Sequence, residues 1–215
     1  MIRPDAAAKV RGAVEYGTDL TAPGMLWGAL ALARVGTGRV RRVDLAVARR
    51  VPGVVAVVGP SELPALLPTG GGDPERPLFP TGTLSYRGQP LAAVAAETPE
   101  AARTAAARVT AEVDPGPTVR SLEEIFPEWP EDPDAAPEVT AHVKAGHGPL
   151  AERFAAADFV VREVYRTQGI AQVALEPHAC LAEVREGRWH VRTSTQTPFG
   201  VREDVAALLG VPEAA

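Results

Sequence analysis

The stretch LSYRGQPLAAVAAETPEAARTAAARVTAEV, residues 84–113, decides the fold. Its first part, 84–96, predicts two strands around a turn near Arg87-Gly88, because apolar runs flank a glycine-containing turn. Thr98-Pro99 is a typical helix start, and the alanine-rich run 101–109 predicts the helix that follows. Residues 109–113 alternate in polarity and predict a further strand. This β-β-α-β order is typical of an α+β domain.

Upstream of this stretch, short apolar runs alternate with glycine and proline. Residues 25–33 (MLWGALALA) and 54–58 (VVAVV) predict buried strands, because both runs are apolar and of strand length. Between them, Asp44 is placed to cap a short helix over 45–50. Residues 68–82 are rich in glycine and proline and predict a surface loop. The basic residues of this region are predicted to form a solvated helix face: Arg39, Arg41, Arg42, Arg49 and Arg50.

Downstream, the composition changes at Asp114. The residues that follow are acidic and rich in proline, a composition that cannot bury much apolar surface and that predicts a linker. A strand is then expected at 158–165, followed by a hairpin that pairs 179–184 with 189–195. A last helix begins at Thr197-Pro198 with Val201, Val205, Leu208 and Leu209 on one face, and Gly210 ends it.

These patterns give three regions. Residues 1–114 form an α+β domain, 115–149 a linker, and 150–215 a smaller α+β region. One hairpin and one helix make a poor independent core. We therefore expect the last region to be completed by further sequence or by another chain.

Composition narrows the classes of function. The 215 residues carry a net charge of −5, which argues against a nucleic-acid surface, since phosphate binding requires a basic face. The single cysteine, Cys180, excludes an intrachain disulfide and a cysteine-based zinc or iron–sulfur site, and its apolar surroundings predict a small core residue. The sequence shows neither a signal peptide nor a run of about 20 apolar residues. A cytoplasmic protein without a membrane partner is expected.

The usual catalytic signatures do not occur: there is no nucleophile elbow, no Walker loop and no His-Glu-x-x-His motif. The glycines at 70–72 follow no predicted strand and open no predicted helix, which disfavours a phosphate site. His142 and His147 have no third ligand nearby, which disfavours a metal site. No catalytic residue and no metal ligand is assigned to this chain.

Two segments carry groups that suit a site. Residues 175–178 (LEPH) place a carboxylate and an imidazole beside a rigid proline, but composition favours a structural turn leading into a strand. Residues 193–198 (TSTQTP) join a strand end to a helix start, where free N–H groups attract anionic or oxo ligands. Gln196 stands at that corner, and its amide can both donate and accept a hydrogen bond. The alternative is that three hydroxyls merely cap the helix: Ser194, Thr195 and Thr197.

A series of loose motifs occurs in a fixed order. They are R-x-D-x-x-x-K-V-x-G-x-x-x-Y-x-x-D at 3–19, D-A-PGV-V at 44–57, YRGQPLA at 86–92, F-AD-Y at 154–165, LEPH at 175–178 and TSTQTP at 193–198. In this order and spacing they resemble the large, molybdenum-cofactor-binding subunit of the xanthine dehydrogenase/aldehyde oxidase family of hydroxylases. The resemblance runs over nearly all of the chain and is weakest in the linker.

The resemblance implies an α/β hammerhead domain over 1–114 and the start of a molybdopterin-binding domain over 150–215. It implies that Gln196 lies at a molybdenum–molybdopterin cofactor and that the reaction is the oxidative hydroxylation of a heterocycle or aldehyde. The implied partners form a hetero-oligomer: a chain with the rest of the cofactor domain, an iron–sulfur subunit and an FAD subunit.

The sequence departs from the family in two respects. Family members often carry histidine where Gln172 stands, which leaves a pocket contact there open. The family's glycine-rich cofactor loop and its catalytic glutamate fall beyond residue 215, so no glutamate of this chain, Glu176 included, is given that role. Two other hypotheses stay open: an inactive truncated fragment with a folded hammerhead domain, and a non-catalytic assembly or binding module that uses 115–149 as a docking strap.

Overall fold

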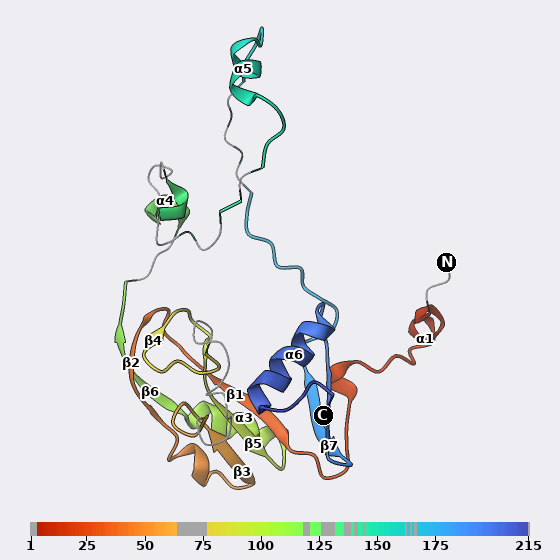
Figure 1. Ribbon diagram of the computed structural model, residues 1–215. Helices are drawn as coiled ribbons and strands as arrows, with labels where there is room; N and C mark the ends of the chain where they lie inside the picture. Colours follow the sequence, from red (N-terminus) through yellow and green to blue (C-terminus); the bar gives the residue numbers. More distant parts are fainter. Residues whose placement is uncertain are drawn as a thin grey trace. The chain divides into compact units, whose positions relative to one another are not determined.

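A computed structural model describes residues 4–63, 77–117, 121–125, 132–135, 139, 142–143, 145–161, 163, 165 and 167–214. The chain divides into two units, one formed by residues 1–118 and 174–215 and the other by residues 119–173. Within the described residues, the first unit holds three antiparallel sheets and the two longest helices (Figure 1). This mixture of helix and sheet confirms the predicted α+β class.

The first sheet has β5 (Pro90–Ala96) at its centre, paired on either side with β1 (Trp27–Leu32) and β3 (Val54–Val58). All three coincide with apolar runs that the sequence predicts as strands, so those predictions are confirmed. Helix α3 (Pro99–Arg108) packs against this sheet (Figure 1). The core between them is aliphatic and rich in alanine: Ala31, Leu45, Ala48, Val57, Ala92, Val94, Ala105 and Ala106.

Helix α3 begins as the sequence predicts. Thr98 is its N-cap, and Thr98 Oγ1 accepts a hydrogen bond from Ala101 N–H at 3.1 Å. Pro99 occupies the first helical position, where a missing N–H costs nothing. The helix ends at Arg108, and the predicted strand follows at once as β6 (Thr110–Pro115).

The second sheet has β2 (Gly38–Asp44) at its centre, between β6 and β4 (Thr83–Leu84). Leu84 is 1% exposed and packs with Ala33, which follows β1, and with Leu91 of β5. One apolar cluster therefore connects the two sheets.

Strand β2 corrects the prediction that Arg39, Arg41 and Arg42 lie on a helix. These arginines are exposed to solvent, as expected, but they lie on a strand. The register shifts between Val40 and Arg42, so Val40 and Val43 both pack against the apolar cluster. This bulge gives the strand an i, i+3 spacing of apolar residues, which in sequence is typical of a helix.

The helix predicted over 45–50 is shorter than expected. Asp44 Oδ1 accepts a hydrogen bond from Ala46 N–H at 2.8 Å, which resembles the predicted cap. Only one 3₁₀ turn follows, η2 (Ala48–Arg50), which carries Arg49. The predicted short helix is therefore present only as this 3₁₀ turn over its last three residues.

The turn near Gly88 is present, but its flanking strands do not pair with each other. β4 pairs with β2, whereas β5 pairs with β1 and β3. Gly88 adopts φ +93°, and its N–H donates to Ala33 O at 2.9 Å. Gln89 is only 7% exposed, and its Oε1 accepts a hydrogen bond from Ser85 N–H at 2.9 Å. A buried amide thus closes this turn.

The third sheet is the predicted hairpin, formed by β7 (Cys180–Arg185) and β8 (Arg188–Thr193). Its two-residue turn, Glu186-Gly187, has φ values of +51° and +76°, as a primed turn requires. Helix α6 (Pro198–Leu209) follows, and Gly210 ends it with φ +64°. These predictions are confirmed.

The remaining elements are short: α1 (Ala6–Val10), η1 (Gly17–Asp19), α4 (Leu122–Ile125), η3 (Pro133–Ala135) and α5 (Leu150–Ala155). The strand predicted at 158–165 is wrong, because the described residues there form neither helix nor strand, and Phe159 is 92% exposed. An alternating run becomes a strand only beside another strand. Of the predicted loop at 68–82, residues 77–82 are described and irregular, and 70–72 lie outside the described residues. No helix of the described part is long and apolar enough to cross a membrane.

Gly38 occupies a position where no side chain fits. Its φ is +157°, and a Cβ there would overlap Asp114 O and lie 2.9 Å from Val113 Cγ1. Both atoms belong to β6, which is paired with β2 at that point. Gly38→Ala is therefore expected to destabilise the chain by about 2–4 kcal/mol, measured by urea unfolding. Gly28→Ala in β1 is the matched control, because a Cβ there meets nothing within 4 Å. Equal losses in the two variants would contradict the steric explanation.

Glu62 ties the end of β3 to η2. Its carboxylate accepts hydrogen bonds from Gly59 N–H at 3.0 Å and Ser61 Oγ at 2.9 Å, and it forms an ion pair with Arg49. Partial burial raises the pKa of the Glu62 carboxyl. The hydrogen bonds and the charge of Arg49 outweigh burial, so the pKa lies below the ordinary value of 4.5.

The stabilisation by Glu62 is expected to depend on pH. At neutral pH, Glu62→Gln should lower the free energy of unfolding by about 1 kcal/mol. Because the folded-state pKa is below the unfolded value of 4.5, the contribution is complete above 4.5 and is lost as the pH falls through the folded-state pKa. Urea unfolding at a series of pH values should show the two proteins converging in acid. Glu112→Gln, exposed on β6, is the control. A difference that stays constant with pH would refute the role of the carboxylate.

Candidate functional site

Residues 194–197 make the corner between β8 and α6. Thr195 Oγ1 accepts a hydrogen bond from Thr197 N–H at 3.0 Å. Thr197 is the N-cap residue, but its side chain makes no cap hydrogen bond. Ser194 Oγ is buried and has no hydrogen-bond partner among the described residues. The alternative that all three hydroxyls cap the helix therefore holds for Thr195 only.

Gln196 is exposed at this corner. The first turn of α6 presents N–H groups and partial positive charge, and the Gln196 amide adds a neutral donor and acceptor beside them. Together with the unpartnered Ser194 hydroxyl, these groups suit a ligand that is rich in oxygen acceptors. The donor set of the corner thus fits the molybdopterin cofactor that the family resemblance implies.

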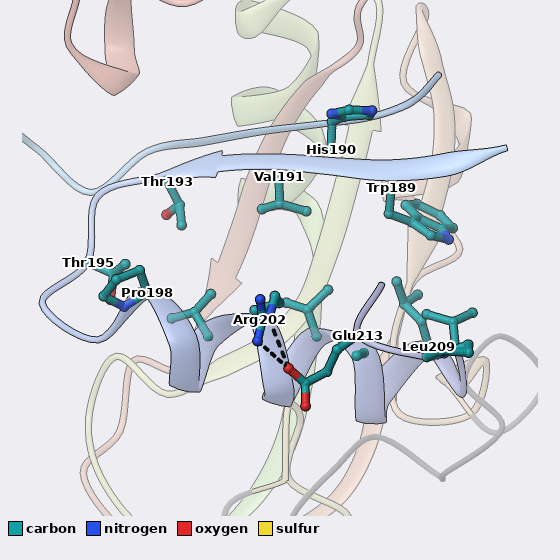
Figure 2. A pocket seen from close by; sticks show the side chains of 14 residues that line it. Trp189, His190, Val191, Thr193, Thr195, Pro198, Arg202, Leu209 and Glu213 are labelled. Atoms are coloured by element: carbon teal, nitrogen blue, oxygen red, sulfur yellow. Dashed lines mark hydrogen bonds and ion pairs between the residues drawn. The ribbon is translucent and has the colours of Figure 1, made fainter. Parts of the chain in front are cut away.

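A cleft of about 380 Å³ lies between β8 and α6 (Figure 2). Trp189, Val191 and Thr193 point from the strand toward the helix. The opposite wall is the apolar face of α6 that the sequence predicts, which includes Val201, Val205 and Leu209.

Arg202 and Glu213 also line this cleft and form an ion pair: Arg202 Nη2 of α6 lies 2.6 Å from Glu213 Oε2 (Figure 2). Trp189 is still 43% exposed, so α6 covers this side chain only in part. Gln196 is not one of the residues that line the cleft. The cleft therefore has a mainly apolar lining with some polar groups, Thr195 among them, and Gln196 lies outside it.

The segment 175–178 forms a bend before β7. Glu176 Oε1 accepts a hydrogen bond from Gly17 N–H at 2.5 Å. His178 is exposed. Because the carboxylate is engaged inside the chain, the contact agrees with the structural-turn alternative for this segment.

Cys180 is exposed at the start of β7, so its prediction as a small core residue is wrong. A residue in a strand is buried only if another layer covers that face, and the pattern of a single strand does not reveal whether it does. Gln172 is exposed and irregular, in the second unit.

The two linker histidines lie in the second unit. His142 Nδ1 is 3.2 Å from Asp134 Oδ1, and His147 is exposed. In the described ranges, no group of three or more His, Cys, Asp or Glu residues could hold a metal ion.

Two contacts of this region have no signal in the sequence. Gly17 and Glu176 are 159 residues apart, and nothing marks Gly17 as a partner of a distant carboxylate. Arg202 and Glu213 lie on either side of the Gly210 helix end, so their pairing depends on the path of the chain after that glycine. The unpartnered Ser194 hydroxyl could have been suspected only from its place beside Gln196.

Two family models match the chain. Residues 11–117 match the aldehyde oxidase and xanthine dehydrogenase a/b hammerhead domain, and residues 132–215 match the molybdopterin cofactor-binding domain. Together they cover most of the sequence, in the order that the motifs predict.

Curated relatives match the chain along nearly its whole length. It is 28% identical to the nicotinate dehydrogenase large molybdopterin subunit of Eubacterium barkeri, over 98% of this chain and 50% of that subunit. It is 29% identical to the aldehyde oxidoreductase molybdenum-binding subunit PaoC of Escherichia coli K12, over 98% of this chain and 28% of that subunit. The chain therefore spans half or less of the length of these relatives.

Solved structures share the fold. Quinoline 2-oxidoreductase from Pseudomonas putida 86 superimposes with a TM-score of 0.81 at 24% identity, over 100% of this chain and 29% of that one. The aldehyde oxidoreductase from Desulfovibrio desulfuricans ATCC 27774 superimposes with a TM-score of 0.76 at 25% identity, over 98% of this chain and 25% of that one. The chain thus belongs to the xanthine dehydrogenase/aldehyde oxidase family of molybdenum hydroxylases and corresponds to the N-terminal portion of the large, molybdopterin-binding subunit.

Proposed function

We propose that this chain is part of a molybdenum-cofactor-dependent oxidoreductase that hydroxylates a carbon centre of a heterocycle or an aldehyde. Two relatives, nicotinate dehydrogenase and quinoline 2-oxidoreductase, are named for heterocycles, and two others are aldehyde oxidoreductases. These names support the two substrate classes and favour neither.

The observation that carries the proposal is the open helix start at the end of β8. Thr197 leaves α6 without a side-chain cap, Ser194 Oγ has no partner among the described residues, and Gln196 is exposed between them. We assign Gln196 to cofactor binding, because its amide can donate and accept without adding charge.

When bound, the cofactor supplies the two-electron oxidation of the substrate carbon, with water as the source of oxygen. Gln196 orients the group at the corner through its amide, and the first turn of α6 stabilises negative charge there. Ser194 offers one further hydroxyl donor. No glutamate of this chain is proposed as a catalytic base, and Glu176 is held by Gly17.

We further propose the organisation of the assembly. The hammerhead domain spans 1–114, the acidic linker 115–149, and the first part of the molybdopterin-binding domain 150–215. The chain spans half or less of its relatives, and the rest of the cofactor domain would come from further sequence or from a partner chain. Iron–sulfur and FAD groups would reside on other subunits of a cytoplasmic hetero-oligomer.

Gln196→Ala in the assembled enzyme is expected to lower kcat by about 10–100-fold, the usual effect of losing an outer-shell hydrogen-bond partner of a metal centre. Steady-state kinetics on material of measured molybdenum content checks this. Gln168→Ala, another exposed glutamine, is the matched control and should leave kcat unchanged. Unchanged turnover in Gln196→Ala would remove Gln196 from the site.

Gentle purification of the chain from its native source is expected to yield stoichiometric molybdenum together with a larger chain, because this chain holds only part of the cofactor-binding region. Metal analysis and native mass spectrometry report both quantities. A lone chain without molybdenum would overturn the proposed assembly and favour an inactive fragment.

A further inference from the structure

One carboxylate joins two segments that are far apart in sequence. Glu176 Oε1 accepts a hydrogen bond from Gly17 N–H at 2.5 Å. Gly17 is the first residue of η1, in the orange-red part of Figure 1, and Glu176 precedes β7, in the blue part. A hydrogen bond with one ionised partner is roughly twice as strong as a neutral one. The bond is therefore able to hold the two segments next to each other.

The bond also completes the hydrogen bonding of η1. Tyr16 N–H donates to Asp19 Oδ2 at 2.9 Å, and Asp19 N–H donates to Tyr16 O at 2.9 Å. This capping box satisfies the ends of the turn but not Gly17 N–H, which lies between them. Glu176 supplies the acceptor that this N–H requires.

Gly17 allows the two segments to come this close. A Cβ at Gly17 would lie 3.1 Å from Glu176 Oε1 and 3.3 Å from Ala179 Cβ. Both distances are shorter than ordinary van der Waals contact. A side chain at position 17 would therefore push the Glu176 segment away from η1.

Further interactions connect the Glu176 segment to the corner between β8 and α6 that carries Gln196. Ala179 O accepts a hydrogen bond from Thr193 Oγ1 at 3.3 Å, and Cys180 is the register partner of Thr193. Thr193 ends β8, and residues 194–197 follow directly. A contact that holds the residues before β7 in place therefore also holds the end of β8 in place.

We propose that Glu176 is a positioning residue. Its carboxylate anchors the start of β7 to η1 and so sets the place of Gln196. The inference rests on the proposed function insofar as Gln196 is a cofactor residue; the contact itself does not depend on it. Glu176 acts through Gln196 and touches no reacting atom.

The contact is tested by amide hydrogen exchange, followed by NMR on the ¹⁵N-labelled full chain. In Glu176→Ala, the exchange of Gly17 N–H should become about ten-fold faster or more. The Thr193, Thr195 and Gln196 amide resonances should also shift. Glu176→Gln should exchange more slowly than Glu176→Ala, because its Oε1 can still accept from Gly17, although without the added strength of a charge. Glu203→Ala, which removes an exposed carboxylate from α6, is the matched control and should change neither readout.

Three results would overturn the proposal: unchanged Gly17 exchange in Glu176→Ala, a Gln variant as fast as the Ala variant, or faster exchange without any shift at the corner. If Glu176→Ala does not fold, Gly17→Ala gives an independent test, with Gly82→Ala as its control, because a Cβ at Gly82 meets nothing within 4 Å. Gly17→Ala should shift the corner resonances and Gly82→Ala should not; no shift in Gly17→Ala would also overturn the proposal.

Kinetics of the assembled enzyme separates this inference from the proposed function. Glu176→Ala should lower kcat about ten-fold at unchanged molybdenum content and KM, and Glu176→Gln should restore it. If Gln196→Ala is fully active while Glu176→Ala accelerates Gly17 exchange, the cofactor assignment fails and the contact stands. If Gln196→Ala is impaired while Glu176→Ala is not, the positioning role fails and the proposed function stands.

Discussion

The close approach of helix α3 to the first sheet is the constraint on which the hammerhead domain depends. The buried face of α3 consists of Ala102, Ala105 and Ala106, which are 1%, 0% and 9% exposed. Each offers a single methyl group, so the helix can lie close to β5, where Ala92 and Val94 meet it. The same strand continues to Leu91, which packs with Leu84 of the second sheet. A larger side chain on the α3 face would lift the helix, separate it from β5 and thereby disturb the cluster that joins both sheets.

The elements that the sequence predicts well are those whose local pattern agrees with their surroundings. Strands β1, β3 and β5 are continuous apolar runs, and α3 combines a Thr-Pro start with an alanine run. Strand β2 is the counterexample, because its bulge places Val40 and Val43 on one side and imitates a helical spacing. The run at 158–165 fails for the opposite reason. Its alternation is correct for a strand, but strand formation requires a neighbour that a local pattern cannot specify.

The candidate site also has features that the sequence predicts and features that it does not. The strand-to-helix corner is predictable, because the hairpin, Thr-Pro and Gly210 mark its limits. What surrounds it is not, because burial and pairing there involve residues distant in sequence. The residues next to Cys180 in the sequence are apolar, as for a core residue, yet Cys180 is exposed. Glu176 carries a carboxylate that is suited to acid–base chemistry, yet this carboxylate accepts a hydrogen bond from Gly17. In both cases the residue type suggests a role, but the three-dimensional surroundings of the residue decide it.

Two helix starts with the same Thr-Pro sequence show why the corner suits a ligand. Thr98, with ψ 154°, turns its hydroxyl to Ala101 N–H and closes the start of α3. Thr197, with ψ 67°, has no cap bond, and its hydroxyl lies 3.5 Å from that of Thr195. A missing cap costs a helix about 1 kcal/mol. At α3, inside a structural domain, that cost is avoided. At α6 it is accepted, because the Thr197 side chain makes no cap hydrogen bond and Thr195 Oγ1 accepts from Thr197 N–H instead. An open helix start beside an exposed Gln196 therefore fits a role in binding a group from outside the chain.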